Sequence, residues 1–134
     1  MNSTAALLAK FKKMPFDLAA FNARQCPLDY FGWHGWAMRY AGQSRLWAAM
    51  RLLESGDAAN AAMLLKDNLS TIGTYTEAPG MSEKTIIARS YAGLAMVDEA
   101  GADAWAAFLA LPWAAEWMAV KGLAGAEEAW AEVV

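Results

Sequence analysis

Apolar residues recur at every third or fourth position along most of this chain, and proline or glycine interrupts the pattern at short intervals. That spacing gathers apolar side chains on one face of an α-helix, whereas a strand would need strict alternation. Alanine, the strongest helix former, is the commonest residue at 31 of 134 positions. Valine, isoleucine and threonine, which favour strands, are scarce. The sequence therefore predicts an all-α protein.

We expect one compact domain over residues 1–134, built as a bundle of seven or eight short-to-medium helices joined by tight turns. Helices are predicted at 4–14, 16–25, 44–54, 57–68, 82–100, 104–111, 113–121 and 126–133. Residues 69–80 are predicted to form a loop, with a short extended piece at 71–76. Pro112 is expected either to kink a helix or to begin the next one.

The segment 28–42 is ambiguous because Gly32 and Gly35 each cost a helix interior about 1 kcal/mol. Trp33, Trp36 and Tyr40 nevertheless fall on one helical face. We interpret the segment as a helix whose glycines let a second helix approach closely. A turn at 32–35 is the alternative.

A weak internal similarity relates residues 54–64 to residues 99–109. Both stretches have the pattern of a helix, a glycine turn and a second helix. Two tandem αα-hairpin units would produce it. A chance alignment of alanine-rich helices is the interpretation that we prefer.

The residues that carry most enzymatic chemistry are few. One cysteine and one histidine exclude an intramolecular disulfide, a CxxC site and an HExxH zinc site. The sequence contains neither a phosphate-binding GxxxxGK motif nor the Glu-x-x-His pattern of di-iron bundles. We expect a cytoplasmic protein that is not an enzyme, holds no cofactor and does not span a membrane.

Charge is distributed unevenly although the formal net charge is only −3, a value that argues against nucleic-acid binding. Residues 1–51 carry seven basic and two acidic side chains, and residues 52–134 carry four basic and twelve acidic ones. This asymmetry would either steer a partner, pair two copies head to tail, or be neutralised within one fold.

The strongest functional signal is the aromatic and methionine content, with seven Trp, eight Met, five Phe and four Tyr. These residue types are enriched at protein interfaces, where Trp, Tyr and Arg are the commonest hot spots. Two clusters qualify, and the one in the C-terminal half forms a stripe with Phe108 if Pro112 only kinks the helix. The candidate partner-binding residues are Trp33, Trp36, Arg39, Tyr40, Trp105, Trp113 and Trp117.

We therefore expect a protein-interaction module: an adaptor, an accessory factor or a small inhibitor of the kind found on phages and other mobile elements. Because 57% of the residues are hydrophobic, we also expect self-association, with a homodimer as the simplest form. The alternative is a binder of an apolar ligand or haem near Trp33, His34 and Trp36. An enzyme using Cys26, His34 and Asp29 is the third interpretation, and a partly buried cysteine without a catalytic role is the simpler one.

Overall fold

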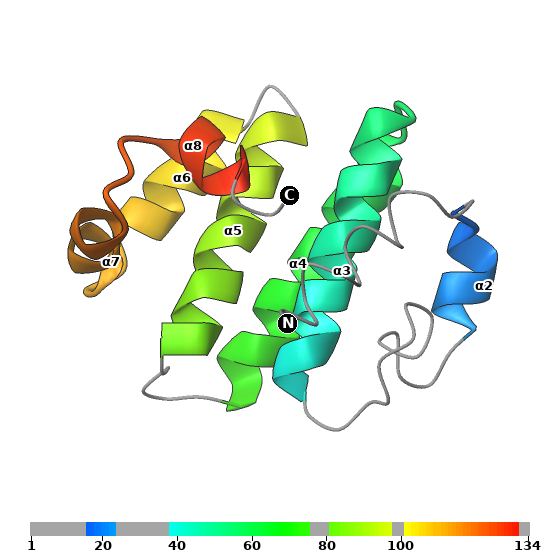
Figure 1. Ribbon diagram of the computed structural model, residues 1–134, viewed down its shortest axis with the longest axis horizontal. Helices are drawn as coiled ribbons and strands as arrows, with labels where there is room; N and C mark the ends of the chain where they lie inside the picture. The colour runs from blue at the N-terminus through cyan, green and yellow to red at the C-terminus, as the bar shows by residue number, and fades with distance from the viewer. Residues whose placement is uncertain (1–15, 24–37, 76–80, 98–100, 132–134) are drawn as a thin grey trace, which may run out of the picture.

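The computed structural model describes residues 16–23, 38–75, 81–97 and 101–131, and within these ranges it contains helices and no strand (Figure 1). The helices are α2 (Leu18–Asn22), α3 (Met38–Glu54), α4 (Ala58–Tyr75), α5 (Met81–Val97), α6 (Gly101–Leu109), α7 (Ala114–Lys121) and α8 (Ala126–Ala131). The all-α prediction is confirmed. The helix predicted at 4–14 and most of the segment 28–42 lie outside the described residues.

Helix α5 lies between two groups of helices. It contacts α3 and α4, which also contact each other, so that these three form a three-helix bundle. It also contacts α6 and α8, which lie on its opposite side, and α7 contacts α6 at that end of the molecule (Figure 1). Both groups are therefore connected through one helix.

Two clusters of buried apolar side chains occupy the two sides of α5. The first joins α2, α3, α4 and α5, and its largest members are Phe21 and Trp47. The second joins α5 to α6, α7 and α8 around Phe108 and Trp117. Helix α5 contributes Ile86, Ile87 and Leu94 to the first cluster, and Ala88 and Ala92 to the second. The alanine face is narrow, and it lets α6 and α8 pack close to the α5 backbone.

Gly93 allows α4 and α8 to approach α5 from two directions. A Cβ atom at this position would lie 2.7 Å from Cζ3 of Trp130 in α8 and 2.8 Å from Cδ1 of Leu65 in α4. Glycine costs a helix interior about 1 kcal/mol relative to alanine. Here that cost is offset by the close packing of three helices.

A hydrogen-bonded polar group lies inside the three-helix bundle, centred on the fully buried Asn68. Its Nδ2 donates to the Gly42 carbonyl of α3 at 2.9 Å and to Ser90 Oγ of α5 at 3.2 Å. Its Oδ1 accepts from Arg45 Nη1 at 3.3 Å, and Ser90 Oγ donates to the Ile86 carbonyl at 2.7 Å. A buried amide is tolerated only when its donors and acceptor are satisfied, and Asn68 meets that condition by joining all three helices.

The turn between α3 and α4 has the chemistry that its sequence predicts. Gly56 has a φ of 86°, and the Asp57 amide donates to the Leu52 carbonyl at 2.8 Å, which closes the end of α3. Asp57 then caps α4, because its Oδ1 accepts from the Asn60 amide at 3.2 Å. The prediction that this glycine ends one helix and this aspartate begins the next is confirmed.

Helix α7 ends in the same way at Gly122, where φ is 69° and the Leu123 amide donates to the Met118 carbonyl at 3.0 Å. A Cβ atom there would touch nothing within 4 Å. Gly122→Ala is therefore expected to lower the free energy of unfolding by about 1 kcal/mol through left-handed backbone strain alone. Urea denaturation measures the change, and Gly122→Asn is the control. Asparagine tolerates this conformation, so equal losses for the two variants would contradict the explanation.

Two helix boundaries differ from the prediction because tertiary packing overrides local propensity. Helix α3 runs without interruption through Gly42, where a break was expected before a separate helix at 44–54. Gly42 is buried, and its carbonyl accepts the hydrogen bond from Asn68 in α4. Helix α4 continues to Tyr75 rather than ending near 68, so the predicted extended piece at 71–76 is wrong for residues 71–75. Leu69 packs against the first core there, which favours the helix over a loop.

Two residues in the C-terminal half that were expected to mark helix boundaries also take positions other than those predicted. Gly101 begins α6 instead of ending the preceding helix, and a Cβ atom on it would collide with the backbone of Ala95. Gly56, its counterpart in the internal similarity, instead has a positive φ and open space around it, which favours a chance alignment. Pro112 neither kinks a helix nor begins one, since it lies in the turn between α6 and α7.

Candidate partner-binding surface

An aromatic cluster centred on Phe108 brings together the three C-terminal tryptophans that the sequence singles out. Phe108 is fully buried, and its ring centroid lies 4.7 Å from that of Trp105. Trp113 and Trp117 present edge-on contacts to the same ring at 5.7 and 6.0 Å. Tyr91 of α5 completes the group at 5.9 Å. The turn containing Pro112 separates α6 from α7, so the aromatic residues cluster without forming a single helical stripe.

The three tryptophans differ in how much of the side chain reaches solvent. Trp117 is only 2% exposed, and its Nε1 donates to Thr85 Oγ1 in α5 at 3.2 Å. Its main role is therefore in the core. Trp105 and Trp113 are half-buried, so each indole combines a packed side with a side that a partner can reach.

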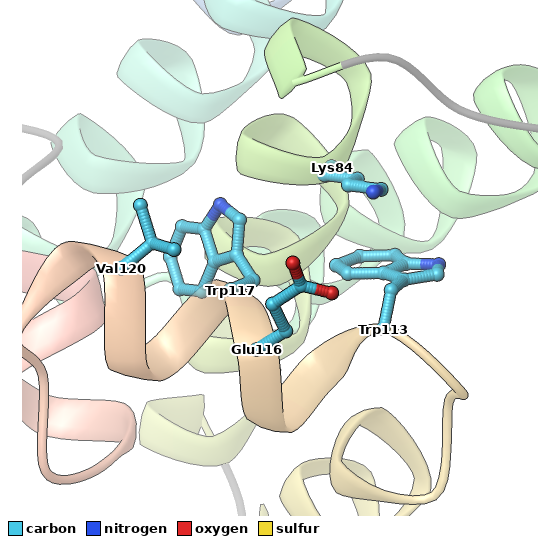
Figure 2. Close-up of a pocket in the computed structure, with 5 residues that line it drawn as sticks. All are labelled: Lys84, Trp113, Glu116, Trp117 and Val120. Atoms are coloured by element: carbon cyan, nitrogen blue, oxygen red, sulfur yellow. The ribbon is translucent and has the colours of Figure 1, made fainter.

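A small pocket opens where α7 meets the N-terminal part of α5, and Figure 2 shows the side chains around it. We call it the Trp113 pocket, and its lining residues are Lys84, Trp113, Glu116, Trp117 and Val120. Its free volume is about 40 Å³, which is room for a few water molecules. Pockets for drug-sized ligands or cofactors are roughly 300–1,000 Å³, so haem does not fit here.

Large apolar side chains also face solvent on α6 and α7. Leu109, the last residue of α6, is 48% exposed, and Val120 near the end of α7 is 65% exposed. Together with the half-buried Trp105 and Trp113, they make up what we call the α6–α7 surface. Elsewhere, Met63 on α4 and Met96 on α5 are the large apolar residues with comparable exposure among the described side chains.

The N-terminal candidates are only partly covered by the structure. Trp33 and Trp36 lie outside the described residues, as do Cys26, Asp29 and His34, which the ligand-binding and enzymatic interpretations require. The backbone at Arg39 and Tyr40 forms the first turn of α3. The structure therefore brings together Trp105, Trp113 and Trp117, and it does not relate them to the N-terminal group.

Four residues that line the Trp113 pocket or support it were not singled out from the sequence: Lys84, Thr85, Glu116 and Val120. Glu116 and Val120 are four residues apart on α7, as Trp113 and Trp117 also are, so helical periodicity places the members of each pair on a common flank. Lys84 and Thr85 meet α7 only through the tertiary fold, and nothing local in the sequence marks that contact.

No protein family model, curated protein or solved structure matches this chain. Among the described residues, no group of three or more His, Cys, Asp or Glu side chains is placed to hold a metal ion. The described helices also include none that is long and apolar enough to cross a membrane. What the surface does must therefore be argued from its own geometry.

Proposed function

We propose that this protein is a protein-interaction module that binds its partner through the α6–α7 surface. The observation that carries the proposal is the exposure of Val120 and Leu109 on the two helices that also hold the half-buried Trp105 and Trp113. Indoles anchored on one side and reachable on the other are frequent hot spots, because their burial by a partner gains much apolar contact at little entropic cost.

The packing beneath the surface supports this role. Phe108 contacts Trp105 and Trp113 from below, and Trp117 is held by its hydrogen bond to Thr85. The half-buried indoles of Trp105 and Trp113 are therefore held in place before binding, which reduces the entropy lost on association. The protein would then act as an adaptor, as an accessory factor or as an inhibitor of the partner that covers this surface.

Self-association is the simplest form of this activity, and light scattering coupled to size-exclusion chromatography tests it first. We expect the isolated chain to form a homodimer at micromolar concentration that persists at high salt, because apolar contacts are not screened. A dimer that dissociates in salt would instead indicate pairing of the basic and acidic halves. A monomer at every concentration would contradict self-association and make a different protein the partner.

Replacing Leu109 and Val120 together with serine is expected to lower partner binding about tenfold, which is about 1.4 kcal/mol. The immobilised full chain captures proteins from a lysate of its native cells, and mass spectrometry quantifies each protein bound by the wild type. Loss of the homodimer gives the same readout if the partner is a second copy. Circular dichroism first shows that the double variant is folded.

Met63→Ser on α4 is the matched control, because Met63 is 63% exposed and Val120 is 65% exposed. It removes a similar apolar side chain from a different helix. Binding should fall for the double variant and stay unchanged for Met63→Ser. An equal loss in both would show non-specific hydrophobic capture, and no loss in the double variant would overturn the assignment of this surface.

A further inference from the structure

One feature of the Trp113 pocket indicates the chemistry of a group that it can bind. The ammonium of Lys84, on α5, lies 5.6 Å from the centroid of the ring of Trp113, the residue just before α7, within the range of a cation–π interaction (Figure 2). One face of this half-buried indole is thus already in contact with a cation from the protein's own chain. The same indole also makes an edge-to-face contact with the Phe108 ring.

The rest of the lining suits a cation as well. Figure 2 shows the Glu116 carboxylate between the indoles of Trp113 and Trp117, with Val120 beyond Trp117. Glu116 is exposed, while Trp117 is buried and held by Thr85. Aromatic rings combined with a carboxylate are the arrangement that proteins use to bind organic ammonium groups. The pocket thus has a rigid aromatic wall and a negative charge at its rim.

We propose that the Trp113 pocket binds a lysine or arginine side chain of the partner protein, which takes the place of Lys84 over the Trp113 ring. This inference rests on the proposed function and specifies the partner's chemistry. The size agrees, because about 40 Å³ plus the space vacated by the Lys84 ammonium accommodates one side-chain head group.

The charge of the surrounding helices favours the same occupant. Over residues 81–97 and 101–131 there are five acidic side chains and three basic ones. The acidic residues are Glu83, Asp103, Glu116, Glu127 and Glu128, and the basic residues are Lys84, Arg89 and Lys121. A basic partner would be attracted to the net negative charge of this side of the molecule.

The direct test uses single amino acids blocked at both ends and follows the indole N–H signal of Trp113 by NMR at constant ionic strength. The probes are N-acetyl-lysine methylamide and N-acetyl-arginine methylamide. The matched neutral probe is N-acetyl-norleucine methylamide, which keeps the aliphatic chain and lacks the charge. Both cationic probes should shift the Trp113 signal at millimolar concentration, and the norleucine probe should not. Trp113→Phe assigns the signal.

Two variants on opposite sides of the pocket give opposite expected changes. Lys84→Met keeps the aliphatic stem and removes the competing ammonium, so the cationic probes should bind about threefold more tightly. Glu116→Gln keeps the shape and removes the charge, so they should bind about threefold more weakly. Weaker binding to Lys84→Met would overturn the idea that Lys84 occupies the site of the incoming group.

The remaining outcomes also decide between occupants. An equal shift from norleucine would show an apolar pocket without cation preference, and no shift from any probe would show no site, so either result overturns the inference. Binding of choline without binding of lysine or arginine would assign the pocket to a lipid headgroup and overturn the inference too.

If Leu109→Ser with Val120→Ser abolishes partner capture while no probe binds, this inference fails and the proposed function stands. If the probes bind while capture is unaffected, the proposed function fails.

Discussion

Replacing Phe108 with alanine is expected to lower the free energy of unfolding by about 4 kcal/mol, because removing a buried phenylalanine ring from a core costs about 3–5 kcal/mol. Phe108 is 0% exposed and contacts the rings of Trp105, Trp113 and Trp117 as well as Tyr91. No neighbouring element can close the resulting cavity without moving α6 or α7. The variant would therefore lose a large fraction of the roughly 5–15 kcal/mol by which a folded domain is stable.

Urea denaturation followed by far-ultraviolet circular dichroism measures this loss, because tryptophan fluorescence would respond to the altered cluster itself. Leu109→Ala is the control, since it removes an apolar side chain from the next position of α6. Leu109 is 48% exposed, so the expected loss is below about 1 kcal/mol. Similar losses in the two variants would mean that Phe108 is not the centre of the second core.

Replacing Asn68 with alanine is expected to lower the free energy of unfolding by about 3 kcal/mol. The variant loses the hydrogen bonds to Gly42, Ser90 and Arg45, and it leaves a cavity where α3, α4 and α5 meet. Each lost hydrogen bond is worth about 0.5–1.5 kcal/mol, and the cavity adds to the total. Asn60→Ala on the same helix is the control, because Asn60 is half-buried and bonds only within the first turn of α4.

A double-mutant cycle separates the hydrogen-bonded group from simple loss of volume. Ser90→Ala alone removes the acceptor for Asn68 Nδ2 and the donor to the Ile86 carbonyl. The loss in the double variant should be smaller than the sum of the two single losses by about 1 kcal/mol, because the Asn68–Ser90 bond is counted in both. Additive losses would show that the two side chains act independently despite their 3.2 Å separation.

The sequence was sufficient to predict the helical class and the helix ends that depend on local chemistry. The turn at Gly56 and Asp57 is an example, since a left-handed glycine followed by an aspartate cap is encoded within three residues. Gly42 and Gly101 were misassigned because their places depend on how the helices pack: the Gly42 carbonyl accepts from Asn68 in α4, and Gly101 lies against the backbone of Ala95 in α5. Local propensity predicts that a glycine breaks a helix. Only the fold shows which glycines allow two segments of the backbone to pack closely.

The candidate surface was predictable to a similar extent. The spacing of Trp105, Trp113 and Trp117 indicated an aromatic cluster, and the structure places all three around Phe108. Spacing cannot distinguish a residue that packs inward from one that remains reachable, so Trp117 was grouped with the other two although it is almost fully buried. Lys84 was missed because its contact with Trp113 joins positions 29 residues apart along the chain.

The shared helix α5 also has a consequence for the order in which the protein is made. As the chain leaves the ribosome, α3, α4 and α5 emerge before α6, so the first core can close while the rest is still being synthesised. At that stage, the side of α5 that later receives α6 and α8 offers Ala88, Ala92 and the ring of Tyr91, and it contributes no leucine or isoleucine to the second core. Tyr91 is therefore the largest apolar group that this face of the helix exposes until α6 is made. The large aromatic side chains of the second core are synthesised last, and they then pack against a three-helix bundle that has already folded.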